Sequence, residues 1–241
     1  MMDKRIQNEI NHGKYLKDLN LGEIWYWETP AGKHRFQRRV QMLSSNIKSN
    51  MNVLEVGCGI GLFTKEIART ESKVTAIDIS EDLLEIARKK VIASNEIFKI
   101  ENAYELAFPD NFFDTIVGSS VLHHLEIEKA IKEFYRVLKP EGGIFFTEPN
   151  MLNPQIILER NIGAIRKWLH NSPDETAFIR WLLKKQFKKY GFQNIQIIPF
   201  DFLHPAVPPF LIPLVKNIGK FLETIPILNE IAGSLYITAE K

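Results

Sequence analysis

The sequence contains a single cysteine, Cys58, among its 241 residues. One thiol excludes a disulfide within the chain, and chains without disulfides suit a reducing compartment. We therefore expect a cytoplasmic location. Cys58 lies between two glycines, where a small side chain fits a tight loop, so we expect it to pack rather than to react. Histidines and cysteines at metal-ligand spacing are also missing, and we predict no metal site.

Long apolar runs and a strong charge bias are missing as well. No window of about 18 residues is apolar enough to predict a membrane span. The first ten residues, MMDKRIQNEI, lack the apolar core of a signal peptide. The net charge is +2, which is too small to favour nucleic acid as a partner. The length suits one α/β domain with additions.

The segment VLEVGCGIG, residues 53–61, is the most informative stretch that the sequence does contain. A short apolar strand carries Glu55 and then breaks into a bend with Gly57, Gly59 and Gly61, after which a helical pattern begins. Glycine lets the backbone turn sharply and lets a ligand approach bare peptide groups. The free N–H groups of the following helix favour an anion. This arrangement is typical of a nucleotide-like cofactor site at the end of a parallel sheet.

A second short strand, residues 73–80, carries Asp78 at its end, 21 positions after Gly57. A carboxylate at about this spacing accepts hydrogen bonds from ribose hydroxyls in a βαβ unit. The dinucleotide fingerprint needs a third glycine at position 62, where this chain has Leu62. The spacing therefore favours a ribosyl cofactor and argues against NAD, although an NAD-dependent oxidoreductase stays an alternative.

Apolar strands alternate with helical segments from residue 53 to residue 149. This pattern predicts an α/β fold with a doubly wound, Rossmann-like parallel sheet covered on both faces. Residues 1–50 are predicted to form a helical cap, with an amphipathic helix at 34–47. The cap also contains Trp25, Tyr26 and Trp27, which either pack the cap onto the core or close over the cofactor. Residues 51–241 are predicted to form the main domain.

The C-terminal third is less regular. We predict one helical stretch from residue 151 to about Asn171, a helix at 177–191, and two last strands at 194–200 and 234–241. The insertion between these strands, about 201–233, is rich in apolar residues and proline. It is either a flap on the core, an apolar wall for a substrate, or a surface for peripheral membrane contact. Prolines exclude one long helix in its first half, and a short amphipathic helix is predicted at 216–228.

Four blocks of this sequence resemble the class I S-adenosylmethionine-dependent methyltransferases, in particular their small-molecule, type 11-like branch. They are VLEVGCGIG, AIDIS, residues 100–125 and residues 133–150, and they occur in the family's order and spacing. The resemblance implies a seven-stranded, mostly parallel sheet whose last strand is antiparallel. It also implies S-adenosyl-L-methionine as cofactor, with S-adenosyl-L-homocysteine as product.

The resemblance further implies which residues contact this cofactor. Asp78 would bind both ribose hydroxyls, Ile79 would lie against adenine, and Asn102 would contact the adenine amino group unless it is only a turn residue. The glycine bend would lie under the methionine and ribose parts. The complete implied set is Glu55, Gly57, Cys58, Gly59, Gly61, Asp78, Ile79, Asn102, Ala103 and Ser119.

His123 and His124 follow the fourth strand and are the candidate general bases, because histidine titrates near neutral pH. We place His124 before His123. The alternative is that both only shape the pocket or bond nearby backbone. Glu148 and Asn150 follow the fifth strand, where acceptors bind in open sheets, but they also suit loop caps.

The sequence thus predicts an enzyme that transfers a methyl group to a small-molecule acceptor by in-line displacement, with lipids and glycan precursors among the candidates. The cap and the insertion are expected to cover the site together. One alternative is a protein that keeps the cofactor pocket without catalysis. Another is a module that binds a membrane surface. The acceptor, the methylated atom and the oligomeric state leave no motif.

Overall fold

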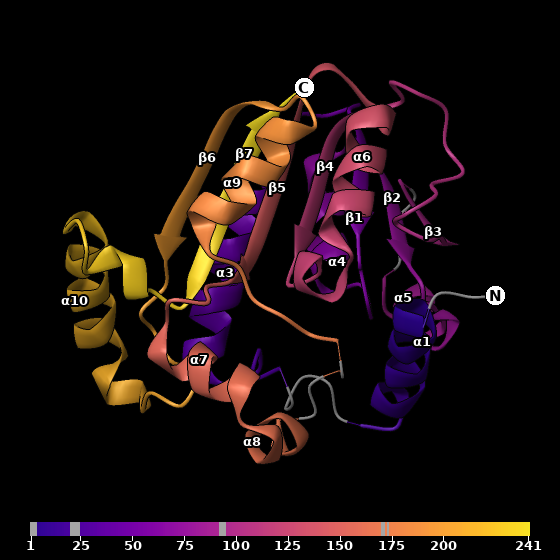
Figure 1. Cartoon of the computed structure of the whole chain (residues 1–241). Coiled ribbons are helices and arrows are strands. Elements are labelled where there is room, and N and C mark those ends of the chain that lie inside the picture. Colours follow the sequence, from indigo (N-terminus) through magenta and orange to yellow (C-terminus); the bar gives the residue numbers. More distant parts are fainter. Residues whose placement is uncertain (1–3, 20–24, 92–94, 170–171, 173) are drawn as a thin grey trace.

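A seven-stranded sheet forms the centre of the molecule, in the order β3-β2-β1-β4-β5-β7-β6 (Figure 1). The computed structural model describes residues 4–19, 25–91, 95–169, 172 and 174–241. β7 is antiparallel to both of its neighbours, β5 and β6, and the other pairs are parallel. The predicted Rossmann-like sheet with an antiparallel last strand is confirmed. The strands are β1 Asn52–Val56, β2 Lys73–Asp78, β3 Glu96–Ile100, β4 Phe113–Ser119, β5 Leu138–Pro149, β6 Gln193–Phe200 and β7 Ser234–Glu240.

Helices cover both faces of the sheet, because neighbouring strand residues alternate between two apolar clusters. Leu54 and Ile116 face one cluster with α6 and α9, whereas Val53 and Val117 face the other with α3, α4 and α5. In α6 the residues Ala130, Ile131, Phe134 and Val137 recur at helical spacing and are buried. These helices are α3 Pro30–Ser44, α4 Leu62–Ile67, α5 Glu81–Lys90, α6 Ile127–Val137 and α9 Arg180–Lys189.

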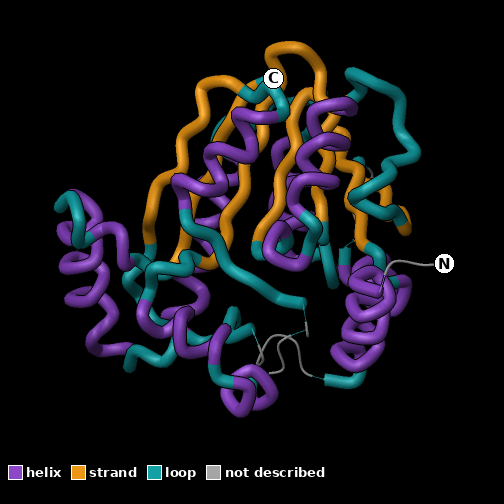
Figure 2. The backbone as a smooth tube through the Cα atoms, in the orientation of Figure 1, coloured by secondary structure: helices purple, strands orange, loops and turns teal. Residues whose placement is uncertain are grey.

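The loops that follow the parallel strands gather at one edge of the sheet (Figure 2). Three further helices border this edge: α1 Lys4–Lys17, α7 Pro154–Asn161 and α8 Gly163–Trp168 (Figure 1). α10 Ile212–Thr224 lies beside the β6 end of the sheet. Short 3-10 turns complete the described elements: Ala68–Thr70, Leu122–His124, Pro209–Leu211 and Asn229–Ile231.

The N-terminal segment differs in detail from the prediction. α3 begins at Pro30, four residues earlier than expected, because Thr29 caps it by accepting the N–H of Gly32 and Pro30 suits a first helical position. The sequence pattern did not indicate α1. It packs against α5 through Leu16 and Leu83. Because tertiary contact holds this weakly amphipathic segment, its periodicity alone does not reveal it.

The helical stretch predicted at 151–171 is two helices, α7 and α8, and α7 ends at Asn161. Its predicted end, at about Asn171, lies outside the described residues. In the insertion, the proline-rich first half carries a 3-10 turn and α10 follows, beginning four residues before the predicted helix. No described helix combines the length and the apolar character that crossing a bilayer requires.

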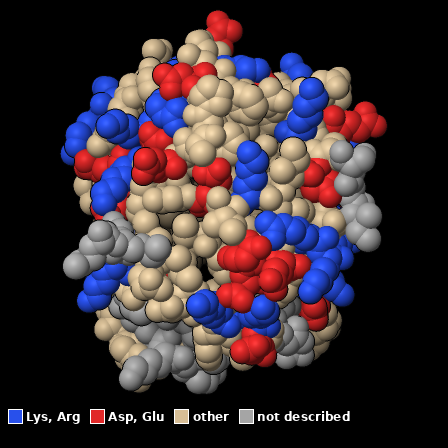
Figure 3. All heavy atoms as spheres, turned by 90° about the vertical axis from the view of Figure 1, so that its right-hand side faces the viewer, with Lys and Arg blue, Asp and Glu red and all other residues tan. Residues whose placement is uncertain are grey.

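On the face that carries α1, α5 and β3, acidic and basic side chains are interspersed among other residues (Figure 3). Lys17 of α1 pairs there with Asp82 and Glu85 of α5, at 2.8 and 3.2 Å. The described part of this face therefore lacks the continuous basic stripe that backbone recognition of nucleic acid requires.

Candidate active site

A cavity of about 870 Å³ lies at the carboxyl ends of the parallel strands. Open α/β sheets bind ligands at this edge, where the strand order reverses between β1 and β4. The wall continues into α1, α3, α7 and the insertion. The cap and the insertion, which the sequence predicts to cover the site together, thus line one cavity.

The glycine bend forms the floor of this cavity. Gly57 and Gly59 have left-handed φ values of +65° and +52°. A Cβ on Gly57 would come within 2.2 Å of a Val121 methyl carbon, whereas one on Gly59 would meet nothing closer than Trp25 at 3.6 Å. Gly57 is thus required by packing. Gly59 leaves open backbone that faces the cavity.

The carboxylate of Asp78 is fixed beside this bend. One oxygen accepts the N–H of Gly59 and the other accepts the N–H of Ser80, each at 2.9 Å. Burial raises the pKa of Asp78, and the two backbone bonds oppose that rise. Each oxygen keeps a second lone pair, so the side chain can still accept bonds from a ligand in the cavity.

Eight of the ten predicted cofactor residues line the same cavity, and they are Gly57, Cys58, Gly59, Asp78, Ile79, Asn102, Ala103 and Ser119. The amide oxygen of Asn102 accepts the N–H of Tyr104 at 3.0 Å, which is the turn contact considered as its alternative. The hydroxyl of Ser119 bonds that of Thr147 at 2.9 Å. Burial raises the pKa of the Cys58 thiol, which keeps it protonated.

Glu55 and Gly61 do not line the cavity. Glu55 is buried behind the bend, one of its oxygens has no hydrogen-bond partner, and burial raises its pKa to about 7. Gly61 has a φ of +77°, and a Cβ there would lie 2.8 Å from Val91. Gly61 therefore permits the close packing of α4 against the end of α5.

His123 is held in a buried ionic network. Its Nδ1 lies 2.6 Å from Glu148, and its Nε2 lies 3.2 Å from Glu175. Burial alone would lower its pKa, but the bonds and charges of Glu148 and then Glu175 outweigh burial and raise the pKa to about 9. With a proton bound and both ring nitrogens engaged, His123 is poorly suited to accept a proton from a substrate.

His124 has a different environment, because it lines the cavity and is only partly buried. Its Nδ1 lies 3.0 Å from a carboxylate oxygen of Glu9 on α1. The other oxygen of Glu9 accepts the hydroxyl of Ser172 at 2.6 Å. His124 is thus the better placed candidate base, with Glu9 as a partner that the sequence pattern did not reveal.

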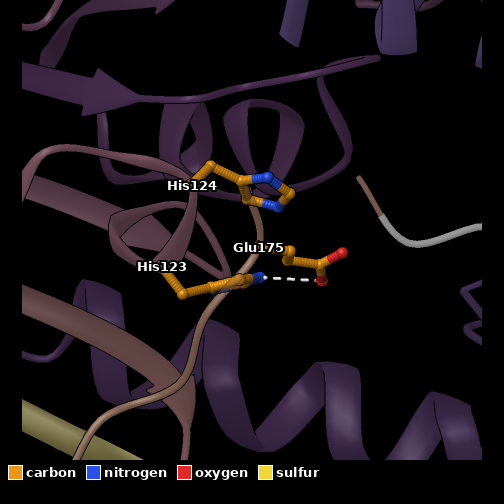
Figure 4. Close-up of side chains that lie close together, drawn as sticks. All are labelled: His123, His124 and Glu175. Carbon is orange, nitrogen blue, oxygen red and sulfur yellow. Dashed lines mark hydrogen bonds and ion pairs between the residues drawn. The ribbon is translucent and has the colours of Figure 1, made fainter. Parts of the chain in front are cut away.

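His123, His124 and Glu175 bring one ligand atom each to within 4.8 Å of one another (Figure 4). A metal would need neutral histidine nitrogens, whereas two carboxylates hold the proton of His123. The guanidinium of Arg160 also lies 2.8 Å from Glu175. The positive charges of His123 and Arg160 disfavour a cation here, and the absence of a metal site stays a prediction.

Glu148 and Asn150 serve structural contacts. Glu148 accepts the backbone N–H groups of Val121 and Leu122, at 2.9 and 2.8 Å. The amide of Asn150 donates to the carbonyls of Glu230 and Ala232, which joins β5 to the end of the insertion. Neither residue lines the cavity.

A cluster of charged residues that the sequence analysis did not single out lines the far part of the cavity. Arg35 and Arg39 of α3 both bond one oxygen of Asp201, which follows β6. The sequence contains one indication of this cluster. Arg39 falls three residues after Phe36 and four before Leu43, on the apolar face of the predicted helix. A buried charge on such a face needs a partner, but the pattern does not say which one.

Comparisons with known proteins are consistent with this geometry. Residues 54–146 match the family described as a methyltransferase domain. Over 125 residues the chain is 35% identical to the ubiquinone/menaquinone biosynthesis C-methyltransferase UbiE of Yersinia pestis, covering 48% of this chain and 50% of that protein. The chain thus spans about half the length of the curated relatives it matches.

Solved structures share the fold over nearly the whole chain. The N-methyltransferase NodS of Bradyrhizobium japonicum, in complex with S-adenosyl-L-homocysteine, superposes with a TM-score of 0.65 at 16% identity, covering 97% of this chain and 98% of that one. The [4+2]-cyclase SpnF gives a TM-score of 0.65 at 20% identity, covering 97% and 96%. At these identities the likeness shows the fold alone.

Proposed function

We propose that this chain, whose residues 54–146 belong to the methyltransferase-domain family, transfers a methyl group from S-adenosyl-L-methionine to a small-molecule acceptor. One observation carries the proposal: the open backbone at Gly59, the fixed carboxylate of Asp78 and the amide of Asn102 line one cavity at the reversal of strand order. A ribosyl cofactor needs these groups together.

The residues present fit this cofactor. Asp78 would accept the ribose hydroxyls, Asn102 and Ile79 would hold the adenine, and the bend at Gly57 and Gly59 would admit the remainder. The bound cofactor supplies an activated methyl group on a positively charged sulfur. The protein's part is then to align the acceptor, exclude water and, for a hydroxyl or amine acceptor, take up a proton. We assign that proton to His124, because His123 is already protonated between two carboxylates.

The acceptor that we favour has an apolar body. Trp25 and Trp27 line the cavity from the N-terminal segment, Phe63 lines it from α4, and Phe202 and Leu203 line it from the insertion. The similarity to an enzyme named for ubiquinone and menaquinone biosynthesis supports the same direction. A quinone precursor, a lipid or a lipid-linked glycan precursor would fill such a cavity.

Peripheral contact with a membrane would deliver such an acceptor, and α10 suits this role. Leu214, Ile218 and Phe221 of α10 continue at helical spacing from Phe210 of the preceding 3-10 turn, and all four are exposed, Phe210 by 79% and Phe221 by 65%. Lys216 and Lys220 lie on the same helix. An exposed apolar stripe beside lysines is the pattern that binds anionic lipid surfaces.

The alternatives differ in one measurable respect each. A silent cofactor-binding protein would bind S-adenosyl-L-homocysteine without any turnover. An NAD-dependent oxidoreductase would bind NAD instead. Leu62 and the chain's G-x-G-x-G phase argue against it.

The test is calorimetric titration of the full chain with S-adenosyl-L-homocysteine and, separately, with NAD. We expect the first to bind and Asp78→Ala to weaken it by about 1.5–3 kcal/mol, since a buried charged acceptor is lost. Asp110→Ala, which removes an exposed carboxylate outside the cavity, is the control and should bind as the parent does. Equal affinity in Asp78→Ala, or preference for NAD, would refute the assignment.

A further inference from the structure

Two arginines at the far end of the cavity share one carboxylate oxygen. Nε of Arg35 and Nη1 of Arg39 both lie 2.8 Å from the same oxygen of Asp201. The second oxygen of Asp201 accepts the N–H of Leu203 at 3.2 Å. The neighbouring Arg38 has its own partner, because it binds Glu223 through two bonds of 2.7 Å. The cluster therefore has two cations and one anion.

The two arginines differ in what remains free. Arg39 is buried, and its other amino group donates to the hydroxyl of Ser234 at 2.6 Å. Arg35 lines the cavity with its side chain 19% exposed, and only its Nε is bonded to a described residue. Both terminal amino groups of Arg35 are thus available. Such a fork binds carboxylate or phosphate through two parallel bonds.

Positive charge exceeds negative charge within the cluster itself. Burial lowers the pKa of Arg39 to about 10, and the charges of Arg35 and Arg38 add to this effect against Asp201. Burial and then Arg35 also lower the pKa of His204, which lines the cavity too. Glu159 also lines the cavity and acts on the pKa of His204 in the opposite direction, because its bond of 2.6 Å comes from the neutral amide of Gln155 and leaves its charge in place.

The cluster lies away from the groups proposed for the cofactor's ribose. Asp201 follows β6 and Ser234 begins β7, whereas Asp78 ends β2. The strand order separates β2 from β7 by four strand spacings, or roughly 19 Å at about 4.8 Å each. An anion at Arg35 therefore belongs to the acceptor's end of the cavity.

The geometry points to a subsite in which the terminal amino groups of Arg35 bind a carboxylate or phosphate group of the methyl acceptor. Trp27, whose ring centre is 5.9 Å from the Arg35 guanidinium carbon, and Phe202 supply apolar surface beside it. The acceptor is then an amphiphile, with an apolar body and an anionic group. The identification of the ligand as the methyl acceptor rests on the proposed function. The anion subsite itself can be tested without turnover.

Arg160 is the competing candidate. Its side chain is 9% exposed, and two of its nitrogens, Nε and Nη1, are buried without a partner. An anion would relieve these unpaired groups, but it would first have to displace the side chains that close them off. Arg35 needs no such movement, and for that reason we favour it.

The test uses octyl phosphate, with inorganic phosphate and 1-octanol as comparison probes, titrated into the full chain at fixed ionic strength with and without saturating S-adenosyl-L-homocysteine. We expect octyl phosphate to bind more tightly than either comparison probe. Arg35→Met should weaken it at least tenfold, and Arg35→Lys should restore part of the loss. Arg180→Met, which removes an arginine outside the cavity, should change nothing.

Four results would overturn the inference. Octyl phosphate would bind no better than 1-octanol, or Arg35→Met and Arg35→Lys would both bind it as the parent does, or Arg160→Met would lose it while Arg35→Met keeps it. A tenfold loss of S-adenosyl-L-homocysteine affinity in Arg35→Lys would assign the anion to the cofactor and would also refute it. The titration without S-adenosyl-L-homocysteine measures the affinity of octyl phosphate for the subsite even if the proposed cofactor fails to bind.

Discussion

The buried pair of His123 and Glu148 predicts how the stability of the protein depends on pH. An unfolded histidine has a pKa of about 6.5. In the folded protein burial alone would lower this value, but Glu148 and then Glu175 raise it to about 9. At about 1.4 kcal/mol per pKa unit, the full difference corresponds to roughly 3 kcal/mol of unfolding free energy.

The sign follows from which state holds the proton more tightly. The folded state does, so the stabilisation is fully present below about pH 6.5 and is lost as the pH rises through about 9. Between pH 6 and pH 8.5 this contribution should fall by about 2 kcal/mol. The raised pKa of Glu55, to about 7, adds a separate decline at the lower end of this range, because an unfolded glutamate ionises near 4.5 whereas the folded Glu55 keeps its proton up to about pH 7. The pKa of Asp201 is lowered to about 2, so this residue changes the unfolding free energy only at acidic pH.

Urea unfolding at intervals from pH 6 to pH 8.5 measures this dependence. We expect His123→Gln to be less stable at pH 6 and to decline by about 2 kcal/mol less than the parent over this range. His34→Gln is the matched control, since His34 is exposed and lies outside the cavity, and it should keep the parent's decline. If His123→Gln declined as steeply as the parent, the ionic network would not hold the proton as argued.

Two further predictions concern the glycine bend and α10. Gly57→Ala should lower the melting temperature and abolish S-adenosyl-L-homocysteine binding, because the added Cβ would lie 2.2 Å from Val121 at a φ of +65°. Gly163→Ala is the control and should be neutral, since a Cβ there has nothing within 4 Å. Equal melting temperatures of the two variants would contradict this prediction. Phe221→Ser should reduce co-sedimentation with anionic vesicles several-fold. Ile97→Ser, which changes an apolar residue of comparable exposure on β3, is the control and should not. Retention of vesicle binding by Phe221→Ser would exclude α10 as the membrane contact.

Local sequence was sufficient for the part of the site that holds the cofactor in our proposal. Gly57 and Gly59 lie within three residues of the end of one short apolar strand, Asp78 ends the next, and parallel strands end at one edge of their sheet. Once the strand pattern is recognised, these groups must therefore meet. The same local logic identified the antiparallel last strand only with help from the family resemblance, since periodicity does not give strand direction.

Some predictions missed because tertiary contact outweighed local pattern. α1 has a weak apolar stripe, but its packing on α5 brings Glu9 to His124. Glu148 was expected to follow the fifth strand, but it lies inside the end of β5 and accepts the backbone N–H groups of Val121 and Leu122 rather than facing the cavity. Which way a side chain turns at a strand end depends on neighbours that sequence spacing does not specify.

The sequence by itself determined the sheet, the glycine bend and the carboxylate beside it, because these features arise from residues a few positions apart and from a period of two or 3.6. Only the tertiary structure decided which charges meet. Arg35 and Asp201 are 166 positions apart and His123 and Glu175 are 52 apart, and each pair is brought together by helices and loops packing over the same sheet edge. Long-range pairing of charges depends on that packing, and so do the protonation of His123 and the free fork of Arg35.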